Sequence, residues 1–139
     1  MADWKNNLGV FFAEQTKDLV DSEEMTLARF IEAVVLPAFQ EIAGEMSKYG
    51  RYVTQRHTDA AASIIVQHNG EEEIQYRIAG RSFPTRILPF TEIRFRQRGG
   101  NRRITVEGLI RSGSDYEMSD ITKDEIIQDF VKHYTHSQR

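Results

Sequence analysis

The chain of 139 residues is 40% hydrophobic and 28% charged, with a formal net charge of −3, which is ordinary for one globular domain with its own core. It contains no cysteine, and this excludes a disulfide framework, a thiolate zinc site and a cysteine nucleophile. No apolar stretch approaches the roughly 20 residues that cross a bilayer, and the N-terminus lacks a signal-peptide pattern, so we expect a cytoplasmic protein with no membrane partner.

Residues 3–19 are predicted to form an amphipathic helix. Large apolar side chains recur there at three- and four-residue spacing, which places them on one face. They include Trp4, Leu8, Phe11 and Phe12. Such a stripe is most often part of the core. If the helix does not close on the protein's own sheet, we expect the stripe to be a homodimer interface.

A second helix is predicted to start at Asp21 or Ser22, either of which could cap it, and to end near Gly50. Pro37 lies inside this helix and has no amide N–H to donate to the preceding turn. We therefore expect the helix to bend or divide near residues 34–36.

From Arg51 onward the hydrophobic period changes to two, which is typical of strands. Strands are predicted over residues 51–57, 60–68, 71–80, 91–98 and 103–111, with the first two either separate or one long bent strand. Asn69-Gly70 indicates a two-residue hairpin turn, which would put Ile65 opposite Ile74. Residues 81–90 contain two prolines, which end the preceding strand, and are predicted to be a connector, with an extended run along a sheet edge as an alternative.

The last helix has a detailed start signal. Thr122 and Glu125 form a capping-box pattern, and Ile121 and Ile126 form a hydrophobic staple around it. The helix is expected to bury Ile126, Ile127, Phe130, Val131 and Tyr134, after a polar loop over residues 112–121. The predicted fold is a single two-layer α+β domain over residues 1–139, with two N-terminal helices, a four- to five-stranded antiparallel meander and a C-terminal helix.

The charge is distributed unevenly along this fold. Residues 1–50 carry nine acids and four bases, whereas residues 77–111 carry two acids and nine bases, all of them arginine. Two hairpin registers keep the apolar residues of 91–111 on one face. A turn at Gly99-Gly100 puts Phe95 opposite Ile104. A turn at Gly100-Asn101 puts Arg94 opposite Glu107, and this opposite-charge pair makes it the favoured register.

In either register, strand alternation predicts that one side of the sheet carries most of these arginines. The outward set is Arg77, Arg81, Arg94, Arg96, Arg98, Arg103 and Arg111. This row is either the solvated side of a half-buried sheet or a binding surface, because guanidinium groups bind carboxylate and phosphate through paired hydrogen bonds. No exposed aromatic ring for base stacking is evident on that face, and the chain as a whole is acidic, which weighs against nucleic acid.

Other candidate chemistry is weaker. His57, Asp59 and Ser63 would point the same way on one extended strand but lack an oxyanion-hole motif. His133 and His136 are spaced like metal ligands, with Asp129 as a third candidate. We therefore assign no catalytic residue, no metal and no cofactor.

Three hypotheses about function follow from these features. The leading one is a non-enzymatic binding or adaptor protein whose arginines contact an anionic partner, either an acidic protein segment, such as the acidic helices of a second copy, or nucleic-acid phosphates. The alternatives are an enzyme or small-ligand-binding domain with a pocket between helices and sheet, in which Tyr76, His57 or Arg86 contribute polar groups, and a structural homodimer without a ligand.

Overall fold

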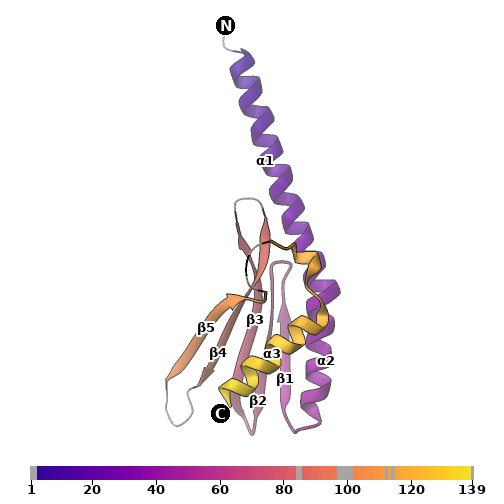
Figure 1. Cartoon of the computed structure of the whole chain (residues 1–139), viewed down its shortest axis with the longest axis vertical. Helices are drawn as coiled ribbons and strands as arrows, with labels where there is room; N and C mark the ends of the chain where they lie inside the picture. The colour runs from indigo at the N-terminus through magenta and orange to yellow at the C-terminus, as the bar shows by residue number, and fades with distance from the viewer. Residues whose placement is uncertain (1–2, 84–85, 97–101, 112, 114, 139) are drawn as a thin grey trace.

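The computed structural model describes residues 3–138 except 84–85, 97–101, 112 and 114, and for residues 13–22 it describes the backbone alone. Within these residues, helices precede a five-stranded antiparallel sheet and a last helix follows it, which confirms the predicted α+β fold. The strands lie in chain order across the sheet. Figure 1 shows helices α2 and α3 over one face of the sheet, while the first part of α1 extends beyond it. None of the described helices is long and apolar enough to cross a membrane.

The N-terminal helices are continuous with one another. Helix α1 (Asp3–Phe30) runs into a π-helical segment (Ile31–Val35) and then into α2 (Leu36–Ser47). The predicted helix start at Asp21 or Ser22 is wrong, because residues 10–36 contain neither glycine nor proline and nothing there obliges the helix to stop. Before Pro37, where the helix was expected to bend or divide, it changes to a π-helical turn but continues into α2 without a break. The wider π-helical turn accommodates Pro37, which has no N–H to donate to the turn before it.

Strands β1 (Tyr52–His57), β2 (Ala61–His68) and β3 (Glu71–Ser82) form a meander. Asn69 and Gly70 both have positive φ angles, 54° and 80°, which confirms the predicted hairpin turn. Near the turn the register is as predicted, but an irregularity after Val66 shifts the pairing by one residue. Val66 therefore faces Ile74, and the prediction that Ile65 does so is wrong. A bulge of this kind re-aims every side chain beyond it.

Strand β4 (Ile87–Arg96) occupies part of the segment predicted to be a connector. That prediction is wrong, since β3 and β4 pair as far as Ser82 and Ile87, and Pro89 lies opposite Gly80 inside the pair. The amide of Ile87 donates to the Glu23 carboxylate of α1 at 3.1 Å. This contact from a distant helix helps to hold the start of the strand, which the local proline signal could not indicate.

Strand β5 (Arg103–Leu109) pairs with β4 in the register that was not favoured. Phe95 faces Ile104, and Ile93 faces Val106. The turn itself lies outside the described residues. Arg94 bonds to Glu92 of its own strand, with 3.3 Å between nitrogen and oxygen, so the cross-strand pair with Glu107 that motivated the other register is not needed. An exposed ion pair contributes at most about 1 kcal/mol to the stability of a hairpin, and apolar packing easily outweighs this contribution.

The core fills the space between the sheet and the helices. The ring of Tyr76 meets Phe39 of α2 and Phe130 of α3 edge to face, with centroids 6.1 and 5.7 Å apart, and all three are fully buried. The segment predicted to be a polar loop contributes buried Tyr116 and Met118, the latter in a 3₁₀ turn (Met118–Asp120). Residues 112 and 114 of that segment lie outside the described part.

Helix α3 (Lys123–Ser137) begins with the predicted capping box. The Thr122 hydroxyl accepts from the Glu125 amide at 3.2 Å, and the flanking Ile121 and Ile126 are buried. Val131 is 48% exposed, so its predicted burial is wrong. Val131 lies at the margin of a groove between α2 and α3 instead of beneath the helix.

Candidate anion-binding face of the sheet

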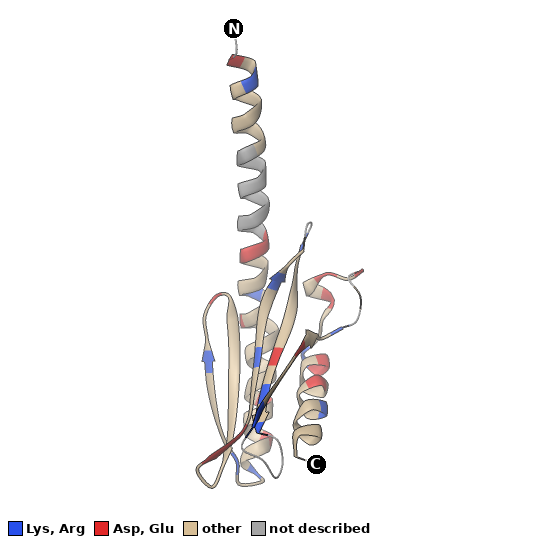
Figure 2. Ribbon diagram, turned by 90° about the vertical axis from the view of Figure 1, so that its left-hand side faces the viewer, with Lys and Arg blue, Asp and Glu red and all other residues tan. Residues whose placement is uncertain are grey.

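Among the residues that the structure describes, six exposed arginines lie on the face of the sheet turned away from the helices. Because side chains alternate along a strand, Arg77 of β3 points opposite to the buried Tyr76 and Ile78. Its cross-strand partners extend the same face over the neighbouring strands. We call this surface the arginine face. Its arginines are Arg56, Arg77, Arg81, Arg94, Arg96 and Arg103. Figure 2 shows basic residues in blue along the strands.

The arginine face holds more positive charge than it neutralises. Of the described residues, three glutamates share it, namely Glu72, Glu92 and Glu107, and six arginines against three glutamates give a net charge of +3. Of the six described arginines on this face, Arg94 alone has a carboxylate within ion-pair distance, that of Glu92. Arg96 stands directly opposite Arg103, an arrangement that destabilises a strand pair unless an anion lies nearby.

Apolar side chains are interleaved with these charges. Ala61, Ala79 and Phe90 lie opposite one another on three successive strands, and each is half-buried. The guanidinium group of Arg81 lies over the Phe90 ring, 4.6 Å from its centroid, and so covers part of that ring. Ile65 is on this face too, because the pairing of β2 with β3 shifts at Glu73, which has no partner in β2. The face therefore offers both guanidinium groups and small apolar contacts.

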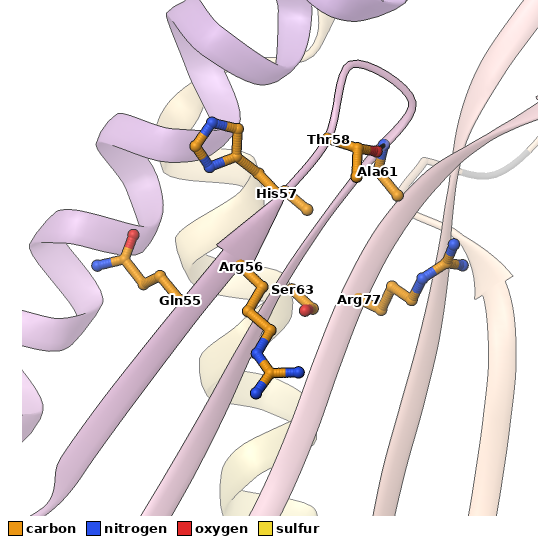
Figure 3. A pocket seen from close by; sticks show the side chains of 8 residues that line it. Gln55, Arg56, His57, Thr58, Ala61, Ser63 and Arg77 are labelled. Atoms are coloured by element: carbon orange, nitrogen blue, oxygen red, sulfur yellow. Dashed lines mark hydrogen bonds between the residues drawn. The ribbon is translucent and has the colours of Figure 1, made fainter.

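One end of the arginine face is hollowed. A surface cavity of about 560 Å³ is lined by residues of β1, β2 and β3, among them Arg56, Ser63 and Arg77. Arg56 pairs with Ser63, and Ser63 pairs with Arg77, so a hydroxyl lies between two guanidinium-bearing positions. Figure 3 shows these side chains on three neighbouring strands. Each of the three side chains carries a hydrogen-bond donor for an anionic oxygen.

Arg56 is the residue that sequence reasoning missed. It lies outside the basic block of residues 77–111, and β1 has no long apolar run that would mark its parity. The signal that could have found it is the strand pairing. Arg56 faces Ser63 and, through it, Arg77.

Five of the seven arginines predicted to point outward lie on the arginine face, and Arg98 lies outside the described residues. Arg111 is placed differently from the prediction, because β5 ends at Leu109 and the chain turns toward α3. Its guanidinium group donates to a Glu125 oxygen at 2.6 Å and to the Asp120 carbonyl at 3.1 Å. The hydrogen bond from Arg111 lowers the pKa of Glu125, and the same bond raises the pKa of Arg111. Arg111 therefore joins the sheet to α3.

The buried polar groups beneath α3 satisfy one another. The Tyr76 hydroxyl donates to Asp129 Oδ2 at 2.6 Å, and His133 Nε2 lies 3.4 Å from the other oxygen of that carboxylate. Burial, with the Asp129 charge beside it, raises the pKa of Tyr76 well above its usual value. A second pair joins α3 to β3, where Tyr134 donates to Glu73 at 2.8 Å. These contacts hold α3 on the sheet.

The two weaker candidate sites do not assemble. Ser63 faces outward opposite Arg56, whereas His57 pairs with Ala62 on the helix side, so the expectation that His57 and Ser63 point the same way is wrong. The ring of His136 packs edge-on against Phe95 at 6.4 Å. Among the residues that the structure describes, no group of three or more acidic or histidine side chains could hold a metal ion.

The three polar residues named in the small-ligand hypothesis do not lie together. Tyr76 is fully buried, Arg86 donates to the Tyr116 carbonyl at 2.7 Å, and His57 is at the sheet edge. A cavity of about 180 Å³ between α1, β4 and the 3₁₀ turn is lined by Arg86, but not by Tyr76 or His57. The charged sheet face is able to contact an anionic group at several points. Comparison with protein-family models, with curated proteins and with solved structures found no significant match for this chain.

Proposed function

We propose that the protein is a non-enzymatic binding or adaptor protein whose arginine face docks an acidic segment of a protein partner. One observation carries this proposal. Six exposed arginines share the face, and among the described residues a single ion pair, Arg94 with Glu92, neutralises any of them. Guanidinium groups that are not neutralised by a nearby acid bind carboxylates through paired hydrogen bonds, and their electrostatic field attracts an acidic partner to the face.

Two features favour carboxylates over nucleic-acid phosphates. The three glutamates on the face would repel a continuous phosphate backbone, whereas an acidic peptide can place its side chains between them. The chain as a whole also has a net charge of −3, unlike most proteins that bind nucleic acid by charge.

Nucleic acid is the second candidate, because the expectation of no exposed aromatic ring on this face is wrong. Tyr52 of β1 alternates onto the arginine face and is 68% exposed. A ring in this position is able to stack on an unpaired base. The binding test therefore measures a single-stranded oligonucleotide as well as an acidic peptide.

The test measures binding of the full chain to a fluorescently labelled glutamate-rich peptide by polarisation. We expect the affinity to fall about tenfold or more between about 50 and about 300 mM NaCl, because exposed charge pairs are screened over this range. Arg77→Gln/Arg94→Gln/Arg96→Gln removes three of the six arginine charges and should weaken binding at low salt by a further factor of about ten or more.

A matched control removes three positive charges from the helix layer. Lys48→Gln/Lys123→Gln/Lys132→Gln changes the net charge by the same amount; Lys48 and Lys132 are exposed, and Lys123 is partly exposed. Binding by this variant should stay within about twofold of the wild-type value. Equal weakening by both variants, or no peptide binding at low salt, contradicts the proposal. Tighter binding to a single-stranded oligonucleotide of equal charge than to the peptide would replace it with the second candidate.

A further inference from the structure

The N-terminal part of α1 is an exposed helix with an apolar stripe. Each of residues 3–12 is exposed, including Trp4 at 60%, Leu8 at 46% and Phe11 at 51%. The contact of α1 with the core is made farther along the helix, where Leu27 and Phe30 are buried. Figure 1 shows the first turns of α1 standing away from the sheet and from α2. A helix of this length is marginally stable alone in water, so its apolar stripe favours a docked state.

The charge of this helix decides between possible occupants of the stripe. Residues 3–24 contain six acids and two lysines, a net charge of −4. Helices that lie on membrane surfaces carry a basic polar face, which α1 lacks. Two copies of α1 paired with each other would bring −4 against −4, which charge repulsion disfavours.

The arginine face has the charge and the shape that α1 requires. Its net charge is +3, opposite in sign to that of the helix. Between the arginines lie two small side chains, Ala61 and Ala79, and the apolar side chain of Ile65, against which large apolar side chains can pack. Residues 3–22 make a helix about 30 Å long, and five strands span about 20 Å, so the helix reaches across the whole sheet.

We infer that α1 of one copy docks on the arginine face of a second copy, and that the second copy returns the same contact. Each protomer thus gives a helix and receives one, as two-fold symmetry requires. The inference rests on the proposed function, because it names the acidic segment that the arginine face binds. Leu8 and Phe11 pack between the arginines of the partner, and the acids of α1 pair with them.

A charge-exchange experiment tests this contact. Arg77→Glu/Arg94→Glu/Arg96→Glu changes the arginine face from +3 to −3. Asp3→Lys/Glu14→Lys/Asp18→Lys changes residues 3–24 from −4 to +2. The helix and the face of each variant then have the same sign of charge, and we expect each variant alone to be monomeric. In an equal mixture the two contacts between unlike copies are again of opposite sign, so the mixture should form heterodimers.

The measurement is the molar mass from sedimentation equilibrium at low salt, with far-UV circular dichroism to verify folding. Wild type should be a dimer, and Leu8→Ser/Phe11→Ser, which alters two exposed side chains and no charge, should weaken it about tenfold or more. A monomeric wild type overturns the inference. So does a sheet variant that still dimerises, because α1 would then pair with something other than the arginine face. The inference is also overturned if the full chain does not self-associate and instead co-sediments with vesicles of anionic phospholipid.

These outcomes separate the inference from the proposed function. If wild type is monomeric and binds the glutamate-rich peptide, the arginine face docks an acidic segment other than α1, and only the inference fails. If wild type neither dimerises nor binds the peptide, both fail. If both hold, the peptide should compete with α1 and dissociate the dimer, since the two occupy one surface.

Discussion

Replacing Tyr76 by phenylalanine tests whether the hydrogen bond beneath α3 stabilises the fold. Tyr76 is fully buried, and its hydroxyl lies 2.6 Å from Asp129 Oδ2, whose side chain is 11% exposed. A hydrogen bond to a charged group contributes about 1.5–3 kcal/mol, and the carboxylate oxygen left behind has little access to water. We therefore expect the variant to lose about 2 kcal/mol of unfolding free energy, which lowers the melting temperature of a chain of this size by about 5–10 °C.

The assay is urea unfolding followed by far-UV circular dichroism, since the single tryptophan, Trp4, is exposed on α1 and reports poorly on the core. Tyr134→Phe is the matched control. It also removes a tyrosine hydroxyl beneath α3, but Tyr134 is half-buried, and its acceptor Glu73 keeps a bond from Arg51 at 3.2 Å. The control should lose less than about 1 kcal/mol. Equal losses in the two variants would refute the reasoning.

The raised pKa of Tyr76 adds a dependence on pH. A pKa that is higher in the folded state contributes stability below the unfolded tyrosine value of about 10, and this contribution is lost as pH rises above it. Phenylalanine has no such group. The difference in unfolding free energy between wild type and Tyr76→Phe should therefore shrink above about pH 10. A difference that grows with pH would contradict the assigned cause.

Three further substitutions test local contacts. Arg111→Gln should cost about 0.5–1 kcal/mol at neutral pH, because the pair with Glu125 is partly exposed. Because folding lowers the pKa of Glu125, its pair with Arg111 contributes stability above about pH 4.3, and this contribution is lost as the pH falls. The unfolding free energies of Arg111→Gln and wild type should therefore converge in acid. A difference near pH 3 as large as that at neutral pH would contradict the assigned pair. Gly80→Ala would place a methyl group 2.7 Å from Leu27 and Ile87 side-chain atoms and should cost about 1–3 kcal/mol, whereas Gly108→Ala, with open space around it, should change stability by less than about 0.5 kcal/mol in the same urea assay. Thr122→Ala removes the cap of α3 and should cost about 1 kcal/mol by thermal unfolding, and Thr122→Ser should restore most of it.

Features set by neighbouring residues were predictable from the sequence. The turn at Asn69-Gly70 and the capping box of Thr122 and Glu125 depend on a few adjacent residues, and both form as expected. The alternation that aims Arg77, Arg94 and Arg96 away from the core is likewise a local property of extended backbone. The composition of residues 77–111 therefore sufficed to predict a basic sheet face.

Features set by contacts between distant segments were not predictable. A bulge after Val66 turned Ile65 outward and placed Arg56 in line with Arg77, and no residue near the turn indicates it. The start of β4 depends on Glu23 of α1, 64 residues earlier in the chain.

The order of helices and strands, the turn, the cap and the side of the sheet that carries most arginines could all be predicted from local patterns, because hydrogen bonding and alternation act within a few residues. Only the tertiary structure decided that Arg111 binds Glu125 instead of joining the arginine face, and that Trp4, Leu8 and Phe11 lie outside the core. The physical reason is that burial and ion pairing depend on which surfaces meet, and an apolar stripe has the same spacing whether or not the sheet covers it.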